Sequence, residues 1–407
     1  MAYHKEHFGE NFEYKDFAEI FNEKIKEWQP DEWAKLFTQI GAKYVVLGTK
    51  HHDGFLLWPS AISNPHNKGF HASRNIVGEL TEAVRNEGLK MGYYYSGGLD
   101  WTFEKAAIRD VTTMLSNAPR TKHYATYVDL HFQELMTKFE PDILWNDICY
   151  PIEGNLYKII AQFYNMNPEG VINDRWHQIP KIARHLKNTR IIKWLINKLA
   201  ARQTKKHGFA AGAPKFGDFS TPEYQPNAKL RSHKWEACRG IGRSFGFNQM
   251  ETVEHYLSAE ELIHSFIDIV SKNGNLLLNV GPTAEGKIPE IQKERLIALG
   301  NWIEANKEGI FGTRPWKRAE AFTDDGLPVR FTQKGDNVYA FILGVPKTTT
   351  LKIPKVAQFS IKDSLVLGLN ESISTKWEGK TLILDLPPLN ETSLKHAVGV
   401  RFQQKKD

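Results

Sequence analysis

The sequence predicts an α/β fold, a barrel of the (β/α)8 type followed by a small antiparallel β domain. Two observations support this prediction. Short apolar runs alternate with helical patterns from about residue 44 to residue 306, which is typical of parallel strands joined by helices. From about residue 313 the apolar runs lie at hairpin spacing with Gly and Pro between them, which indicates an antiparallel sandwich. We therefore expect a barrel-like domain over residues 1–312 and a β-sandwich domain over residues 313–407.

The expected elements follow one another in that order. Residues 1–40 carry an apolar helical stripe, with a second helix that begins at Pro30 and ends at Gly41. The other expected elements of the first domain are strands at 44–49, 91–96, 143–145, 171–175 and 275–280, and helices at 76–88, 124–139, 156–164, 259–271 and 288–306. The expected sandwich strands are 330–332, 337–343, 350–353, 365–368 and 381–386.

The composition is that of an ordinary globular protein, with 41% apolar and 25% charged residues among 407. Two cysteines, Cys149 and Cys238, are too few for a disulfide framework, which favours a reducing compartment. The first residues lack the apolar core of a secretory signal, and no stretch approaches the ~20 apolar residues of a membrane span. The sequence predicts a cytoplasmic protein that does not bind membranes.

The net charge of +6 comes from one segment. Residues 176–217 hold ten Lys and Arg and no Asp or Glu, and the rest of the chain has 43 basic and 47 acidic residues, a net charge of −4. Apolar residues within this insertion have helical spacing and predict a basic amphipathic helix: Ile192, Leu195, Ile196 and Leu199. Aromatic residues are sparse between the basic ones, so we expect no binding to nucleic acid. The segment is expected to form an oligomer contact or a clamp over the loop that carries Glu223, and a solvated face is the alternative.

Polar side chains lie at the ends of several expected strands. They are His51, His52, Asp53, Tyr94, Asp147 and Arg175, with Glu223 further along the chain. The carboxyl ends of parallel strands form the edge where barrels carry their chemistry. Asp147 could equally be a helix cap or a turn residue. We expect no metal site, because the adjacent histidines point in different directions and have no third ligand at metal-binding spacing.

Asp147 and Glu223 form a pair of carboxylates. Two carboxyl groups that flank a glycosidic bond, one a nucleophile or base and the other an acid, are the equipment of a glycosidase. Glu236, in Lys-Trp-Glu, is the alternative acid, and it could also be a pocket-wall residue that bonds Arg239 or a sugar hydroxyl. The content of 11 Trp, 14 Tyr and 23 Phe suits a carbohydrate site.

Four motifs strongly resemble those of the α-L-fucosidases of glycoside hydrolase family 29, and the resemblance runs from about Gly9 through the carboxy-terminal sandwich. They are Lys50-His51-His52-Asp53-Gly54-Phe55-Leu56-Leu57-Trp58, Gly92–Ser96, Leu144-Trp145-Asn146-Asp147, and Asn273-Gly274-Asn275-Leu276-Leu277-Leu278-Asn279-Val280-Gly281-Pro282. The first and third are specific to that family.

This resemblance implies a retaining α-L-fucosidase that removes terminal fucose from oligosaccharides or glycoconjugates, with transfucosylation as a further outcome. It places the nucleophile on Asp147 and the acid/base on Glu223, with Glu236 as the alternative. The residues implied to hold fucose hydroxyls are His51, His52, Tyr94 and Arg175, and those implied to hold its methyl group are Trp145 and Phe245. No metal or cofactor is implied.

The chain departs from the family pattern at its start. The family's first strand, a Phe-Gly-x-Phe-x-His-Trp-Gly run with a sugar-binding histidine, does not occur in this sequence. We expect an incomplete barrel with an open edge at residues 44–49, covered in a homo-oligomer. Two alternatives to a complete enzyme are a truncated fucose-binding relative with weak or no turnover, and one piece of a split enzyme.

Overall fold

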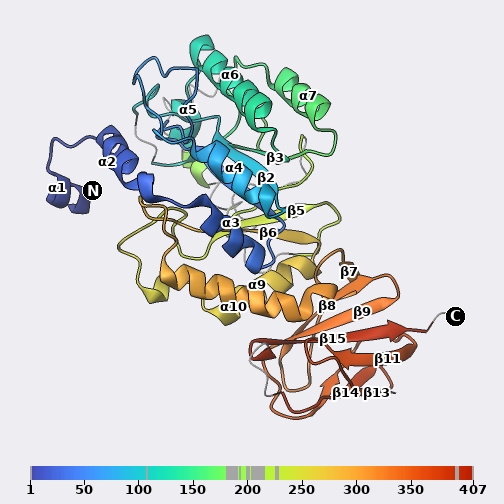
Figure 1. Cartoon of the computed structure of the whole chain (residues 1–407). Helices are drawn as coiled ribbons and strands as arrows, with labels where there is room; N and C mark the ends of the chain where they lie inside the picture. Colours follow the sequence, from blue (N-terminus) through green and yellow to red (C-terminus); the bar gives the residue numbers. More distant parts are fainter. Residues whose placement is uncertain are drawn as a thin grey trace. The chain divides into compact units, whose positions relative to one another are not determined.

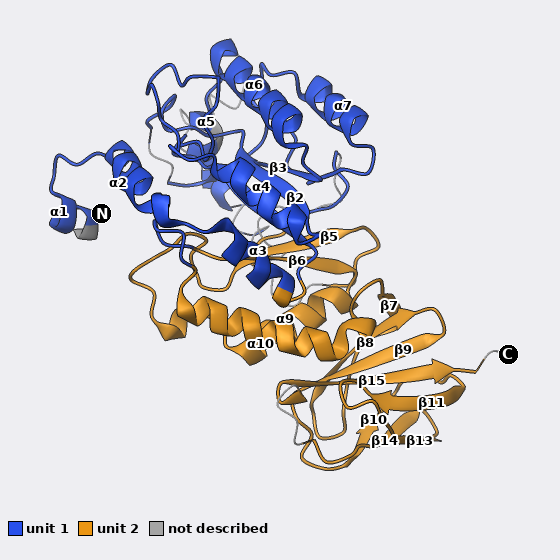
Figure 2. Cartoon of the chain, in the orientation of Figure 1, with its two compact units in different colours: residues 1–38, 42–220, 282–287 blue, residues 39–41, 221–281, 288–407 orange. Residues whose placement is uncertain are grey.

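The computed structural model divides the chain into two compact units, shown in Figure 2. It describes residues 2–106, 109–179, 191, 194–198, 202, 216–224, 229–389 and 394–405. Unit 1 comprises residues 1–38, 42–220 and 282–287, and unit 2 comprises residues 39–41, 221–281 and 288–407.

Unit 1 is built on a four-stranded parallel sheet in the order β1-β2-β3-β4. The strands are β1 (Tyr44–Lys50), β2 (Lys90–Ser96), β3 (Ile143–Asp147) and β4 (Val171–Ile172). The register pairs Gly48 with Tyr94, Tyr94 with Trp145, and Ser96 with Asp147. Because all four strands run in one direction, their carboxyl ends meet at one edge of the sheet.

Helices precede the first of these strands and connect the successive strands, as Figure 1 shows. They are α1 (Ala2–Phe8), α2 (Phe17–Lys24), α3 (Pro30–Gln39), α4 (Ile76–Asn86), α5 (Val111–Asn117), α6 (Lys122–Phe139) and α7 (Leu156–Met166), with short 3-10 turns at Tyr14–Asp16 and Ile25–Glu27. Helix α4 packs on β1 and β2 and contacts α6, which contacts α7. The core between helices and sheet is rich in aromatic rings, among them the fully buried Trp58, Tyr93 and Phe132.

The described residues of unit 2 form a parallel strand pair, two α-helices and two antiparallel sheets. The pair is β5 (Trp235–Gly240) with β6 (Gly274–Asn279), and the helices are α9 (Ala259–Ser271) and α10 (Glu290–Asn306), with 3-10 turns at Val253–His255 and Lys307–Gly309. Ser258 starts α9 through a capping box with Glu261, in which each side chain accepts from the other residue's backbone N–H.

The antiparallel strands of unit 2 form sheets in the orders β12-β11-β15-β9-β8-β7 and β10-β14-β13. They are β7 (Arg314–Phe322), β8 (Pro328–Lys334), β9 (Asn337–Leu343), β10 (Thr350–Ile353), β11 (Ile361–Val366), β12 (Glu371–Ser372), β13 (Ser374–Glu378), β14 (Thr381–Asp385) and β15 (Ala397–Gln404). Apolar side chains from both sheets share one core that includes Phe331, Leu351 and Leu384.

Most of the expected elements are confirmed, with four corrections. Asp147 is the last residue of β3 and does not follow the strand. Strand β4 has two residues where five were expected. The helical region before residue 40 is broken into short pieces, although α3 does begin at Pro30. Strand β11 covers 361–366 and not 365–368.

Much of the basic insertion lies outside the described residues, including Ile192 and Leu199. Residues 194–198 are helical, as expected, and Leu195 is exposed. Both cysteines are buried, and neither takes part in a disulfide. Within the described parts of the chain, no helix has the length and apolarity to cross a membrane.

Candidate active site

Asp147 ends β3 with a buried carboxylate that three hydrogen bonds hold. Its Oδ1 accepts from Arg175 Nη1 at 2.7 Å and from the backbone N–H of Ile148 at 2.8 Å. Its Oδ2 accepts from the Tyr94 hydroxyl at 2.7 Å. Tyr94 comes from β2 and Arg175 follows β4, so the two strands beside β3 supply both side-chain donors. The carboxylate is therefore fixed in orientation.

The hydrogen bonds also decide the ionisation of Asp147. Burial is the largest single influence, and alone it raises the pKa of the carboxyl group. The charge of Arg175 and the hydrogen bonds from Tyr94 and Arg175 act in the opposite direction and outweigh it. The pKa of Asp147 is held below its ordinary value, so the site presents an ionised carboxylate at neutral pH.

Asparagine side chains continue the pairing of β3 with β4 where the short β4 ends. Asn146 N–H donates to Asn173 Oδ1 at 3.0 Å, and Asn173 Nδ2 donates to the Asn146 carbonyl at 2.8 Å. Asn146 Nδ2 donates to the Arg175 carbonyl at 3.0 Å. These bonds replace the missing strand ladder and place Arg175 beside Asp147.

The backbone turns sharply after Asp147. Ile148 and Cys149 have φ of +55° and +79°, a left-handed conformation that costs a β-branched residue about 1–3 kcal/mol. The N–H groups of Gly97 and Gly98 both donate to the Asp147 carbonyl at 3.2 Å. A Cβ at Gly98 would lie 1.8 Å from the Ile148 carbonyl oxygen, so only glycine allows this close approach.

His51 and His52 follow β1 and their rings stack at 3.9 Å between centroids. His52 Nδ1 lies 2.6 Å from the Ser96 hydroxyl at the end of β2. Burial, followed by the charge of His51, lowers the pKa of His52 to about 3. His52 is therefore neutral at physiological pH, and its ring can exchange hydrogen bonds with a neutral polar ligand.

A buried ion pair supports the turn that carries Ser96. Lys50 and Asp100 have fully buried side chains, with Lys50 Nζ 3.3 Å from Asp100 Oδ2. The same ammonium donates to the carbonyl oxygens of Ser96 at 2.7 Å and Leu99 at 3.0 Å. Thr102 donates its N–H to Asp100 Oδ1 at 2.9 Å, so the turn is fixed from both ends.

Aromatic rings connect the histidines to Arg175. The rings of His51 and Tyr94 stack at 6.1 Å between centroids, and those of Tyr94 and Trp145 at 5.4 Å. The Arg175 guanidinium lies 4.6 Å from the Trp145 ring centre. The site in unit 1 thus combines a fixed carboxylate, neutral imidazoles and an aromatic wall.

The remaining predicted residues lie in unit 2. Glu223 is half-buried and forms an isolated parallel bridge with Cys238 of β5. Tyr224, next to it, has φ of +43°, and its ring lies 5.1 Å from that of Phe245. Glu236 lies in β5 and is 3% exposed, so it has far less access to solvent than Glu223.

A sequence profile of the family described as Alpha-L-fucosidase matches residues 1–308. The chain belongs to the α-L-fucosidase family. It is similar to the α-L-fucosidase of Dictyostelium discoideum, with 33% identity over 377 residues that cover 91% of this chain and 73% of the relative. The tissue α-L-fucosidase of Homo sapiens is 31% identical over 397 residues, which cover 95% of this chain and 76% of that protein.

The chain is also similar to a solved structure, that of Thermotoga maritima α-fucosidase in complex with a mechanism-based inhibitor. The two sequences are 38% identical, and the structures superpose with a TM-score of 0.84 over 99% of this chain and 85% of that chain. The likeness extends through both compact units.

Six of the site residues predicted from the sequence lie together in unit 1: His51, His52, Tyr94, Trp145, Asp147 and Arg175. Glu223, Glu236 and Phe245 lie in unit 2. The sequence analysis missed the roles of Ser96 and of the Lys50–Asp100 pair in holding the strand ends. It also gave no role to Trp101, whose N–H donates to the His52 carbonyl at 2.7 Å. A lysine directly after an apolar run was the available signal of a buried partner.

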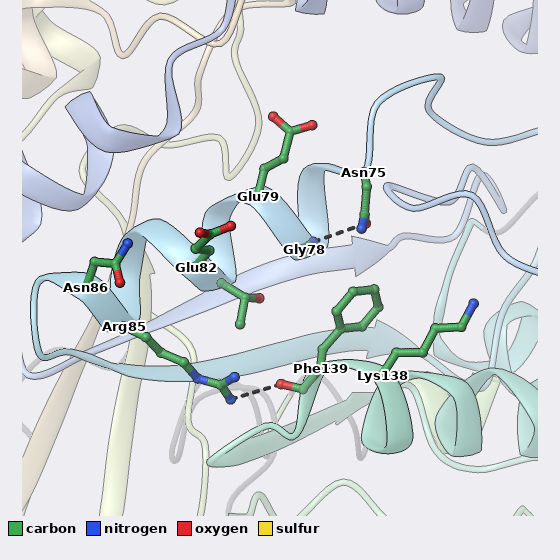
Figure 3. A pocket seen from close by; sticks show the side chains of 9 residues that line it. Asn75, Gly78, Glu79, Glu82, Arg85, Asn86, Lys138 and Phe139 are labelled. Atoms are coloured by element: carbon green, nitrogen blue, oxygen red, sulfur yellow. Dashed lines mark hydrogen bonds between the residues drawn. The ribbon is translucent and has the colours of Figure 1, made fainter.

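A separate hollow of about 550 Å³ lies between α4 and the end of α6. Figure 3 shows the side chains that line it. Arg85 Nη2 closes part of it by donating to the Phe139 carbonyl at 2.9 Å. Asn75, at the start of α4, accepts from the Gly78 N–H at 3.1 Å. The residues that line it are Asn75, Gly78, Glu79, Thr81, Glu82, Arg85, Asn86, Lys138 and Phe139, and none of them belongs to the site around Asp147.

Proposed function

We propose that the chain is a retaining α-L-fucosidase, which hydrolyses terminal α-L-fucose from oligosaccharides or glycoconjugates through a covalent fucosyl-enzyme. The observation that carries the proposal is the ionised, immobilised carboxylate of Asp147 at the end of β3, held by Arg175 and Tyr94. Membership of the α-L-fucosidase family supports the choice of sugar.

Asp147 acts as the nucleophile in this proposal. One carboxylate oxygen attacks the anomeric carbon of fucose while the bond to the leaving-group oxygen breaks, giving a fucosyl ester. Oδ1 carries two donors and Oδ2 carries one, so we assign the attack to Oδ2. The donors on Oδ1 then hold the ester carbonyl, and water later attacks the anomeric carbon and releases Asp147.

Glu223 acts as the acid/base, and Glu236 remains the alternative. The acid gives its proton to the leaving-group oxygen in the first step and takes a proton from water in the second. A group that changes protonation twice in each turnover needs exchange with solvent, and Glu223 is half-buried while Glu236 is almost fully buried. This difference supports Glu223.

The sugar-binding roles follow from the chemistry of each side chain. Neutral His51 and His52, with Tyr94 and Arg175, would bond the fucose hydroxyls, and Trp145 with Phe245 would take the methyl group. All of the proposed steps use side chains of this chain, without metal or cofactor.

Azide rescue tests the assignment of the nucleophile. Asp147→Gly should lower kcat by at least roughly a thousandfold, because the bond-forming group is lost. Azide should then restore part of the activity and give β-fucosyl azide, whereas Glu223→Gly with azide should give the α-anomer. Retention of full activity by Asp147→Gly would overturn the proposal.

Three further proposals concern assembly and context. We propose that the strands of the first domain, over residues 1–312, form a barrel-like arrangement without the family's first strand, and that 313–407 is a separate sandwich domain. Strand β1 lies at the edge of the four-stranded sheet among the described strands, which supports a homo-oligomer that covers it. Sedimentation at micromolar concentration should give a mass larger than that of the 46.6 kDa monomer.

The two cysteines, neither of which is in a disulfide, support a cytoplasmic location.

A further inference from the structure

The aromatic wall of unit 1 continues beyond the residues that the proposed function uses. From His52 it passes to Trp101, with 6.5 Å between ring centroids, and from Trp101 to Tyr14, with 5.4 Å and nearly perpendicular rings. At its inner end the wall reaches Tyr94 and Trp145, which lie against Asp147 and Arg175. The wall therefore leads without a break from the buried carboxylate toward solvent.

The two outer rings are exposed although their positions are fixed. Tyr14 is 54% exposed and Trp101 is 39% exposed. Trp101 follows Asp100 of the buried ion pair, and its N–H donates to the His52 carbonyl at 2.7 Å. Burial around the Tyr14 hydroxyl, followed by the charge of Asp53, raises the pKa of Tyr14 to about 12.

We propose that Tyr14 and Trp101 form a binding subsite for the sugar ring next to fucose in the glycan. This inference rests on the proposed function, because it takes fucose to lie at Asp147. A glycan whose terminal fucose contacts the inner wall has its next sugar outside the buried pocket. Exposed, immobilised aromatic faces suit the C–H face of a pyranose, since little side-chain freedom is lost on binding.

The exposed Tyr157 on α7 lies apart from this wall. It is 66% exposed, and its ring lies 5.8 Å from that of Phe216. Isolated apolar side chains at a surface are ordinary and carry no inference. Tyr157 therefore supplies a matched control for removal of an exposed ring.

The experiment measures the binding of two probes to the full chain by calorimetry. One probe is L-fucose, which fills the inner pocket alone. The other is fucosyl-lactose with sulfur in place of the glycosidic oxygen, which the enzyme does not cleave. Trp101→Ala should weaken binding of the thio-trisaccharide about tenfold, equivalent to about 1.4 kcal/mol, and change that of L-fucose by less than about twofold.

Companion variants separate the subsite from a structural effect. Tyr14→Ala should weaken binding of the thio-trisaccharide by about threefold, and Trp101→Phe should retain most of the affinity for it. Tyr157→Ala should change the affinity for neither probe. Equal losses for both probes, or no loss for the trisaccharide, would overturn the subsite. The subsite would also be overturned if the chain were a dimer and Trp101→Ala converted it to a monomer, because the two rings would then serve self-association. Failure of the unmodified chain to bind L-fucose would instead overturn the proposed function, and the subsite with it.

Discussion

Asp147 and Glu223, the two carboxylates of the proposed mechanism, lie in contrasting surroundings. Asp147 is buried, ends a regular strand, and has donors on both oxygens. Glu223 is half-buried, lies on an isolated bridge, and precedes a residue in the left-handed conformation. A nucleophile must remain ionised and in one place, whereas an acid/base must gain and lose a proton in every turnover. The contrast teaches that rigidity is concentrated where a bond forms, and access to water where a proton is exchanged.

The largest expected effect is the loss of activity on removal of the acid/base, and it tests whether Glu223 or Glu236 has that role. Glu223→Gln should lower kcat/KM for a fucosyl oligosaccharide by on the order of 10²–10⁴, because its sugar leaving group needs protonation. A dinitrophenyl fucoside, whose leaving group needs no proton, should lose far less in its first step. The basic limb of the pH profile should disappear as well.

Glu236→Gln is the matched variant for that test. It should keep the basic limb of the pH profile, because Glu236 is buried in β5 and is not the proton donor in the proposal. If Glu236→Gln loses the limb and Glu223→Gln keeps it, the acid/base assignment moves to Glu236.

A second prediction tests whether the buried Lys50–Asp100 ion pair stabilises the unit 1 site. Lys50→Met leaves the Asp100 carboxylate buried without its cation, and we expect it to reduce the free energy of unfolding by about 3–5 kcal/mol. Urea denaturation measures the change. Lys90→Met is the control, since Lys90 pairs with Asp142 at 2.8 Å but is 70% exposed, and we expect a cost of about 0–1 kcal/mol. Equal costs in the two variants would contradict the argument.

The smallest effect concerns one hydrogen bond on the nucleophile. Tyr94 donates to ionised Asp147 and so lowers its pKa; Tyr94→Phe removes that bond and should raise the pKa of Asp147. Because the proposed mechanism needs the ionised carboxylate, the acid limb of kcat/KM should move to higher pH. Tyr95→Phe removes a bond to His131 Nδ1 and should leave that limb in place. An unmoved limb in Tyr94→Phe would show that this bond does not tune the nucleophile.

Sequence patterns located the parallel strands of unit 1, because a parallel strand is a compact apolar run, although β3 extends to Asp147 and β4 ends at Ile172. That placed His51, Asp147 and Arg175 near one another without any structure. Strands with weaker patterns escaped prediction. Strand β7 carries several charged residues, and β15 contains Gly399 within its run, so neither has clean alternation.

The supporting contacts of the site could not be predicted from the sequence. Lys50 and Asp100 are fifty residues apart, and Tyr14 precedes Trp101 by a still longer stretch. Periodicity reports which face of an element is apolar, but it says nothing about which side chains from distant segments meet. Such partners depend on tertiary packing, as does the left-handed turn at Ile148.

The three donors around Asp147 have a consequence for any variant that lacks its side chain. In Asp147→Gly the Arg175 guanidinium, the Tyr94 hydroxyl and the Ile148 N–H would still point at one small space, because strands β2 and β3 and the asparagine pair hold them there. Gly97 and Gly98 would still bond the backbone carbonyl of residue 147, which the substitution leaves intact. The variant would therefore be a receptor for small anions, and rescue by azide should saturate with concentration and be competed by formate.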